Sequence, residues 1–404
     1  MTTTQGARAG RSVILALLAS TLVVGRAEAV GSSTRPGSIL IFPKVVTTGG
    51  RDTLIHITNT GNMANSVRCF YVNGESCVGS DFYLSLTRQQ PTAWQAGEGR
   101  PFSLRDEQRG LDPGPVPPIP TDYAGALVCV EVDPSDDGAP MVRNQLKGEA
   151  TIIDGAGGLT QGNVGKYNAV ALAGKSGTDD SALDLDEDEY EACPAALQLN
   201  FQKPGEDGTI AEFGNGGLCG DGAPCATDSD CVSPDPQNQT CTTRLSRQTT
   251  RLTVVPCTLD LERLTKTTAA LTFQGRDETE APISGSRRFS CWDSFDVEDI
   301  FGDSLLTPFN TVSVWGTDPA SPIAAPKAVP VVAVSETFYS DSLGNTASAL
   351  VNLHGLGRCN AATSSDGYGG LPCTRDSDCT KPGTAITLGV CVQGAVGTIT
   401  LSAP

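Results

Sequence analysis

Histidine is almost absent from this chain: His56 and His354 are the only two among 404 residues. Both lie in short runs that alternate between polar and apolar residues, a pattern typical of half-exposed β-strands. Neither belongs to an H-E-x-x-H zinc pattern, and no G-x-S-x-G nucleophile turn accompanies them. Hydrolysis near neutral pH usually recruits a histidine, a metal, an activated nucleophile or a tuned pair of carboxyls, so the scarcity argues against most hydrolytic enzymes.

Basic residues and long apolar runs are scarce as well. The chain has 28 Lys and Arg against 46 Asp and Glu, a formal net charge of −18. A nucleic-acid partner requires a basic face that releases counterions, so we expect none, and the same deficit disfavours anionic membranes. No run after residue 25 approaches the roughly 20 apolar residues that cross a bilayer, so we expect no membrane span.

The N-terminus has the three parts of a secretory signal peptide. Arg8 and Arg11 form the basic region, residues 12–25 are apolar, and Ala-Glu-Ala at 27–29 supplies the cleavage motif. Cleavage near Ala29 predicts a secreted, periplasmic or cell-surface protein. In such a compartment cysteines form disulfides rather than remain thiols.

Fourteen cysteines punctuate the chain, and eight of them lie in two loops built on one repeated motif. The motif Pro-Cys-x-x-Asp-Ser-Asp-Cys occurs at residues 224–231 and 372–379, among Gly, Pro, Asp and Ser that bury little apolar surface. We predict that each loop is held by its own disulfides and that its Asp side chains accept backbone N–H groups. Each set of four allows three pairings: Cys219, Cys225, Cys231 and Cys241 in the first loop, and Cys359, Cys373, Cys379 and Cys391 in the second.

The other six cysteines are expected to form three further disulfides. One joins two strands of the second half, one closes the turn at residues 73–74, and the third follows by elimination. The predicted pairs are Cys257–Cys291, Cys69–Cys77 and Cys129–Cys193.

From residue 38 onward the chain alternates with period two in short β-branched runs, bounded by Gly, Pro, Asn and Asp. No segment shows convincing helical periodicity. About fifteen strands are too many for one sandwich of seven to nine. We therefore predict an all-β protein made of two immunoglobulin-like β-sandwiches with two disulfide-stapled loop insertions.

The domain boundaries follow from the change in composition. Residues 176–194 are acidic and poor in β-formers, so they are predicted to connect a first sandwich at 30–175 to a second at 195–404, after a signal peptide at 1–29. The cysteine-rich insertions occupy 215–243 and 356–394, and the first of them is the alternative boundary.

The hallmark residues of an immunoglobulin domain are only partly present. Cys69 and Cys129 have a plausible spacing for its disulfide, with Trp94 between them. However, polar neighbours place Trp94 outside any strand, and Leu127 stands where the tyrosine corner belongs. The term immunoglobulin-like therefore describes the expected architecture alone.

Four runs carry a resemblance to other proteins: residues 37–44, 86–91, 146–150 and 252–257. Together with the paired PCxxDSDC loops, they resemble a set of uncharacterised exported β-sandwich proteins of Gram-negative bacteria. The resemblance covers most of the mature chain. It carries no known activity, so it transfers no functional residue.

The acidic connecting segment is the best candidate for a metal site. Asp184, Asp186 and Asp188 alternate as the carboxylates of a calcium loop do, although Glu189 and Ala195 stand where an EF-hand needs Gly and Glu. These three aspartates are the candidate calcium ligands, and the sequence suggests no other cofactor.

These features favour an exported structural or binding module, of scaffold or adhesion type, in the cell envelope or the extracellular space. We expect it not to be an enzyme, and its partner to be a protein or a glycan. One alternative is a secreted carboxylate-dependent hydrolase such as a glycosidase, which needs two carboxyls in one cleft. The other is a calcium-dependent adhesion component, which needs an oxygen-lined cation site.

Overall fold

A computed structural model describes residues 30–134, 138–155, 164–176, 182–203, 217–220, 224–225, 228–232, 234–236, 239–243, 246–263, 265–302, 305, 309–322, 326–341, 346–359, 372–380 and 389–401. The predicted signal peptide lies outside them. In these ranges the regular structure is nearly all β-strand; the helices include two single turns, α1 (Leu104–Glu107) and α2 (Glu298–Phe301), and 3-10 turns at Asp228–Asp230 and Asp376–Cys379, so the all-β prediction is confirmed. None of the helices in the described ranges has the length and apolar character needed to cross a membrane.

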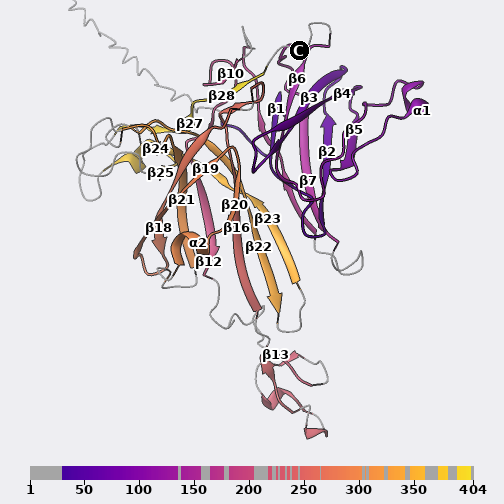
Figure 1. Ribbon diagram of the computed structural model, residues 1–404. Coiled ribbons are helices and arrows are strands. Elements are labelled where there is room, and N and C mark those ends of the chain that lie inside the picture. The colour runs from indigo at the N-terminus through magenta and orange to yellow at the C-terminus, as the bar shows by residue number, and fades with distance from the viewer. Residues whose placement is uncertain are drawn as a thin grey trace, which may run out of the picture.

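The first sandwich consists of two antiparallel sheets packed face to face (Figure 1). One sheet has the strand order β4-β3-β6-β1-β9, and the other has the order β5-β2-β7-β8. Side chains from both sheets, including Phe42, Ile55 and Trp94, form one buried core. The strands are β1 (Ile39–Val46), β2 (Arg51–Asn59), β3 (Asn65–Asn73), β4 (Gly79–Leu86), β5 (Pro91–Gln95), β6 (Ala124–Val132), β7 (Leu146–Asp154), β8 (Val164–Asn168) and β9 (Val170–Leu172).

The second sandwich pairs a larger sheet with a smaller one. The larger sheet has the order β19-β18-β21-β12-β24-β25, with β26 beside β24, and the smaller has the order β20-β16-β22-β23. Leu252, Phe273 and Val314 lie in the core between them. The strands are β12 (Ala196–Gln202), β16 (Ser246–Pro256), β18 (Thr268–Asp277), β19 (Pro282–Ser290), β20 (Asp293–Asp296), β21 (Phe309–Thr317), β22 (Val331–Asp341), β23 (Thr346–Asn352), β24 (His354–Cys359), β25 (Pro372–Cys373) and β26 (Cys391–Val392).

A third core joins the two sandwiches. The five-stranded sheet of the first sandwich also buries its outer face, where Ile39, Ile41 and Val128 meet Leu183 and Ile399. Because both faces are covered, β1 is buried along its whole length and its sequence is apolar rather than alternating. The covering strands are β10 (Ala182–Leu185), β28 (Gly397–Thr400) and β17 (Leu259–Asp260), with β11 (Cys193–Pro194) paired to β27 (Gly394–Ala395) nearby.

The acidic segment at 176–194 contributes to this covering layer. It contains β10 and β11, which pair with the C-terminal strands β28 and β27. The end of the chain therefore returns to the connection between the sandwiches.

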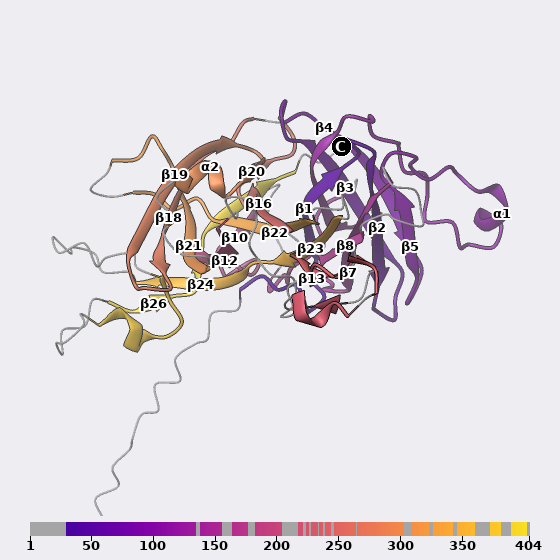
Figure 2. The same ribbon diagram turned by 90° about the horizontal axis from the view of Figure 1, so that it is seen from below.

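The two cysteine loops form small units at the margins of the sheets (Figures 1 and 2). In the first loop, β14 (Pro224–Cys225), β13 (Gly217–Leu218) and β15 (Thr242–Thr243) make a separate sheet below the sandwiches, whereas the second loop extends the larger sheet through β25 and β26. Cys219–Cys231, Cys359–Cys379 and Cys373–Cys391 each pair within one loop, as predicted. Cys241 is also disulfide-bonded, and the side chain of Cys225 lies outside the described residues.

The aspartates of the repeated motif cap both loops in the same way. Asp228 accepts the N–H of Cys241 at 2.7 Å, and Asp376 accepts the N–H of Cys391 at 2.8 Å. In each loop the first Asp of Asp-Ser-Asp therefore holds the fourth cysteine. The predicted capping role is confirmed for these residues.

The three pairings predicted for the other cysteines are wrong. The observed disulfides are Cys69–Cys129, Cys77–Cys291 and Cys193–Cys257. Cys77 lies in the turn after β3 and has φ of +62°, so it does not face β3 as a hairpin partner of Cys69 would. Cys69 instead lies directly opposite Cys129 on the neighbouring strand, with their Cα atoms 4.0 Å apart.

The disulfide and the tryptophan that suggested an immunoglobulin domain have other roles here. Cys69–Cys129 joins adjacent strands of one sheet, whereas an immunoglobulin disulfide links the two sheets. The expectation that Trp94 lies outside any strand is also wrong, because it lies in β5 and faces the core. Its indole N–H donates to the Tyr71 hydroxyl at 2.7 Å. β5 is an edge strand whose alternate residues face solvent, which explains its polar sequence.

Candidate functional site

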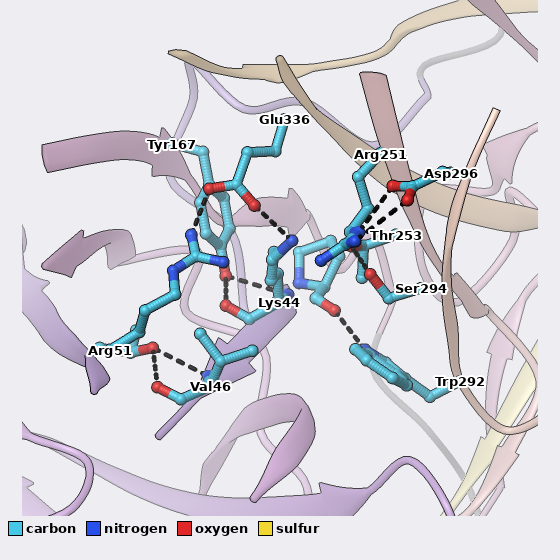
Figure 3. A network of polar contacts seen from close by, with 12 residues as sticks. Lys44, Val46, Arg51, Tyr167, Arg251, Thr253, Trp292, Ser294, Asp296 and Glu336 are labelled. Atoms are coloured by element: carbon cyan, nitrogen blue, oxygen red, sulfur yellow. Dashed lines mark hydrogen bonds and ion pairs between the residues drawn. The ribbon is translucent and has the colours of Figure 1, made fainter. Parts of the chain in front are cut away.

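Two polar features stand out against the apolar cores, and the first lies where the sandwiches meet (Figure 3). The register of β1 against β6 shifts between Phe42 and Val45. Pro43 has no N–H to donate, and a shift of this kind accommodates it. Lys44 at this shift exchanges two backbone hydrogen bonds with the Tyr167 hydroxyl, at 3.1 and 2.5 Å. The irregularity turns the Lys44 side chain toward the second sandwich.

There the Lys44 ammonium meets a buried carboxylate. Its Nζ lies 2.7 Å from Glu336 Oε2, and Arg51 forms an ion pair with the other carboxylate oxygen. Lys44 is 2% exposed and Glu336 is fully buried. We call Lys44, Arg51 and Glu336 the interface triad. Because β22 supplies Glu336 and the first sandwich supplies both cations, the triad joins the two sandwiches.

An aromatic ring extends this network. Phe338, two residues after Glu336 on β22, has the guanidinium groups of Arg51 and Arg251 each 5.5 Å from its ring centre. Arg251 also makes a two-pronged ion pair with Asp296, at 2.9 and 3.2 Å. Burial lowers the pKa of Lys44 to about 8, and the attraction of Glu336 only partly opposes that shift. The buried site therefore disfavours the positive charge of Lys44, even with Glu336 beside it.

Other contacts fasten the same joint. The disulfide Cys77–Cys291 links the two sandwiches, and the Trp292 indole N–H donates to the Pro43 carbonyl at 2.8 Å. At a second point, the Asn352 side chain exchanges two hydrogen bonds with the backbone of Asn168, at 3.1 and 2.7 Å, so that β8 meets β23. Covalent, ionic and hydrogen-bonded contacts thus connect the two sandwiches.

The second polar feature is a hollow of 1020 Å³ at one end of the second sandwich, which we call the end hollow. Along three strands the inward-facing residues change from apolar to polar as they reach it. The changes run from Phe273 to Asp277 on β18, from Val312 to Asn310 on β21, and from Leu252 to Gln248 on β16. Thr337 and Tyr339 of β22 and Phe309 of β21 also line it.

Asp277 is the charged group buried in the end hollow, with 6% of its surface exposed. Its Oδ1 accepts hydrogen bonds from the Thr279 N–H and hydroxyl and from the Ala281 N–H, at 2.8 to 2.9 Å. Burial raises the pKa of Asp277, but these hydrogen bonds outweigh it and hold the pKa below its usual value. Its Oδ2 is buried and has no hydrogen-bond partner among the described residues. The hollow therefore contains an ionised acceptor with a free oxygen.

The residues singled out from sequence lie elsewhere. His56, in β2, is half-exposed with its Nδ1 3.3 Å from Glu149, and His354 is exposed at the start of β24, so both are strand residues as predicted. Asp184, Asp186 and Asp188 lie in and after β10. Asp184 accepts the Thr398 hydroxyl, and Asp186 caps the turn that follows it.

These three aspartates do not converge in the described residues. The one cluster there with three metal-type ligand atoms within 4.8 Å of one another is Cys359, Cys373 and Cys379. All three sulfurs are engaged in disulfides and offer no thiolate to a metal. A calcium site at Asp184, Asp186 and Asp188 stays a prediction.

The sequence reasoning missed the triad and the end hollow. One signal was available for the hollow, because the strand pattern of residues 268–277 ends in an aspartate at an inward position. The triad had no such signal, because 292 residues separate Lys44 from Glu336.

Comparison with known proteins adds little to this geometry. No protein-family model matches the chain, and no curated protein matches it. Solved structures give distant likenesses. Thermotoga maritima 1070 is 10% identical, with 35% of this chain and 98% of that one covered and a TM-score of 0.23. The PBSX exported protein XepA is 8% identical, with 71% and 84% covered and a TM-score of 0.17.

The third likeness is to a lectin of Pleurotus ostreatus in its apo form, which is 11% identical, with 92% of this chain and 88% of that one covered and a TM-score of 0.13. TM-scores this low carry no argument about fold or function. The proposals below depend on the geometry of this chain.

Proposed function

We propose that this protein is an exported binding module that holds a small polar ligand in the end hollow and breaks no bond in it. The observation that carries the proposal is the polar lining at positions where a sandwich core is apolar. Buried polar atoms without partners cost stability, about 1–3 kcal/mol each. Such departures from an otherwise consistent pattern are expected at functional sites.

The contacts between the sandwiches support a binding role. A ligand site works best when the supporting strands hold its groups in place before the ligand arrives. Gln248, Thr337 and Tyr339 of the end hollow belong to the same sheet, β20-β16-β22-β23, that carries Glu336 of the interface triad. The contacts that fix this sheet to the first sandwich also fix one wall of the hollow.

The carboxyl groups favour binding over the hydrolase alternative. A glycosidase needs one carboxyl with a raised pKa to act as the acid. Among the residues that the structure describes, the Asp and Glu side chains whose pKa is shifted by their surroundings all shift downward; they are Asp112, Glu149, Asp260, Asp277 and Asp378. Asp277 is therefore suited to accept hydrogen bonds rather than to donate a proton.

Buried carboxylates outside the hollow are occupied by structural contacts. Glu131 accepts the backbone N–H groups of residues 143, 144 and 145 and the Asn65 amide, at 2.6 to 2.9 Å. Glu191 forms an ion pair with Arg35 at 2.9 Å, and Glu336 belongs to the triad. These contacts give the three buried acids structural partners, so their burial needs no catalytic role to explain it.

The disulfides fit an oxidising compartment, which agrees with export. A signal peptide cleaved near Ala29 is the route that we propose, with the mature chain acting in the periplasm, at the cell surface or outside the cell.

Thermal unfolding of the oxidised mature chain, residues 30–404, in the presence of a panel of small polar compounds tests the function. The panel contains neutral sugars, amino acids, nucleosides and polyamines. We expect at least one class to raise the Tm, because a ligand that binds only the folded state stabilises it. The shift should vanish in Asp277→Asn and persist in Asp260→Asn. Asp260 is a matched control, because it also caps a turn and lies outside the hollow.

Two results would overturn the proposal. If no class gave a shift that depends on Asp277, the end hollow would not be a binding site. If mass spectrometry found the bound compound cleaved by the wild-type chain but intact with Asp277→Asn, the protein would be a hydrolase.

A further inference from the structure

We propose that the ligand of the end hollow is a neutral saccharide, an inference that rests on the proposed binding function and names its ligand class. The first step is the character of the lining. Amide and hydroxyl side chains predominate, and each of them both donates and accepts hydrogen bonds. At the inward-facing positions they are the amides of Gln248 and Asn310 and the hydroxyls of Thr337 and Tyr339. A sugar presents the same mixture of donors and acceptors on every carbon.

The second step is the free carboxylate oxygen. Asp277 Oδ2 is an ionised acceptor buried without a partner among the described residues, and it lines the hollow. An acceptor of this kind favours a ligand rich in donors, and sugar hydroxyls are such donors without bringing a charge.

The third step concerns the aromatic rings at the rim. Phe309 is 56% exposed and Tyr339 is 36% exposed, and both line the hollow. The C–H face of a pyranose ring is apolar, so it loses contact with water when it packs on such a ring. A site that combines aromatic faces with directed polar groups suits a molecule that has both surfaces.

The charged side chains of the hollow are of both signs. Asp277 and Glu278 line the hollow and repel anions, whereas Arg276 lines it too and repels cations. Charged groups are few compared with neutral ones in the lining, so a net charge on the ligand would add little to its affinity. The volume of 1020 Å³ lies just above the range of about 300–1000 Å³ for small-molecule pockets, which leaves room for more than one sugar unit.

Isothermal titration of the oxidised chain, residues 30–404, tests the ligand class. The probes are hexoses, N-acetylhexosamines, pentoses and their short oligosaccharides, with spermidine and lysine as cationic competitors. We expect saturable binding of at least one neutral saccharide. Asp277→Asn should weaken it at least about tenfold, because a hydrogen bond to a charged acceptor is lost.

Phe309→Ala provides a second variant whose fold is not at risk, because the ring is more than half exposed. It should also weaken saccharide binding severalfold, whereas Asp260→Asn should leave the affinity unchanged. Unchanged saccharide affinity in both Asp277→Asn and Phe309→Ala would overturn the site. Binding of spermidine or lysine through Asp277 without any saccharide would overturn the ligand class and leave the binding function standing. Absence of Asp277-dependent binding to every probe would overturn both.

Discussion

Replacing Glu336 with glutamine should destabilise the protein more than removing either of its cationic partners. Glu336 is fully buried and is the anion between two cations, with Lys44 Nζ at 2.7 Å and Arg51 on its other oxygen. At about 3 Å and an effective dielectric constant of about 20, each attraction is about 5 kcal/mol before the cost of desolvation. Glutamine keeps the shape but leaves the buried Lys44 ammonium and the half-buried Arg51 guanidinium facing a neutral amide. Breaking a buried pair in this way costs about 3–5 kcal/mol.

Lys44→Met is the matched comparison. It removes one cation but leaves Glu336 paired with Arg51, and the methionine fills the space of the lysine stem. The desolvation cost of the lysine, visible in its lowered pKa, disappears with it. We therefore expect a loss of only about 0–2 kcal/mol, since removing a buried charge that remains compensated is cheap.

Urea unfolding of the disulfide-bonded chain, followed by tryptophan fluorescence and circular dichroism, measures both variants. Trp292 lies at the joint and Trp94 lies in the first core, so the fluorescence reports on both regions. A split transition in Glu336→Gln would show that the joint opens before the sandwiches unfold. The reasoning is refuted if Glu336→Gln costs less than about 1 kcal/mol, or no more than Lys44→Met.

Three further predictions concern single features. Burial lowers the pKa of Lys44 to about 8 in the folded chain, against 10.5 in the unfolded chain, so the lysine charge destabilises the fold below pH 8. The stability of the wild type relative to Lys44→Met should therefore rise by up to about 3 kcal/mol between pH 8 and 10.5. A difference in urea midpoints that does not change with pH would contradict this. Replacing Cys69 and Cys129 together by alanine opens a loop of 60 residues and should cost about 4 kcal/mol in urea unfolding, and a loss under about 1 kcal/mol would argue against the loop-entropy account. Backbone and hydroxyl hydrogen bonds from Thr374 lower the pKa of Asp378 to about 2. The ionised carboxylate should therefore stabilise the folded chain above about pH 4, and this contribution should fade as the pH falls toward 2. If NMR showed the carboxyl titrating near 3.8, those hydrogen bonds would be disproved.

Local features of this protein were readable from its sequence. Period-two alternation identifies strands such as β2, because successive side chains point to opposite faces of a sheet. The cysteine loops close on themselves because their partners are 12 to 20 residues apart, and chains that short and rich in Gly and Pro have no other core. The Asp capping in both loops follows from the same short spacing. In each case the interacting groups lie close along the chain.

Tertiary structure alone decided the features that join distant segments. Cys77 bonds to Cys291, 214 residues away, and the spacing that favoured Cys69 as its partner contains no information about that approach. Lys44 and Glu336 meet because a register shift in β1 and the outward face of β22 happen to coincide. Asp277 and Gln248 share a hollow although they belong to opposite sheets. Strand order and register are set by the arrangement that buries the apolar faces of the whole chain. No local sequence pattern therefore predicts these contacts between distant segments.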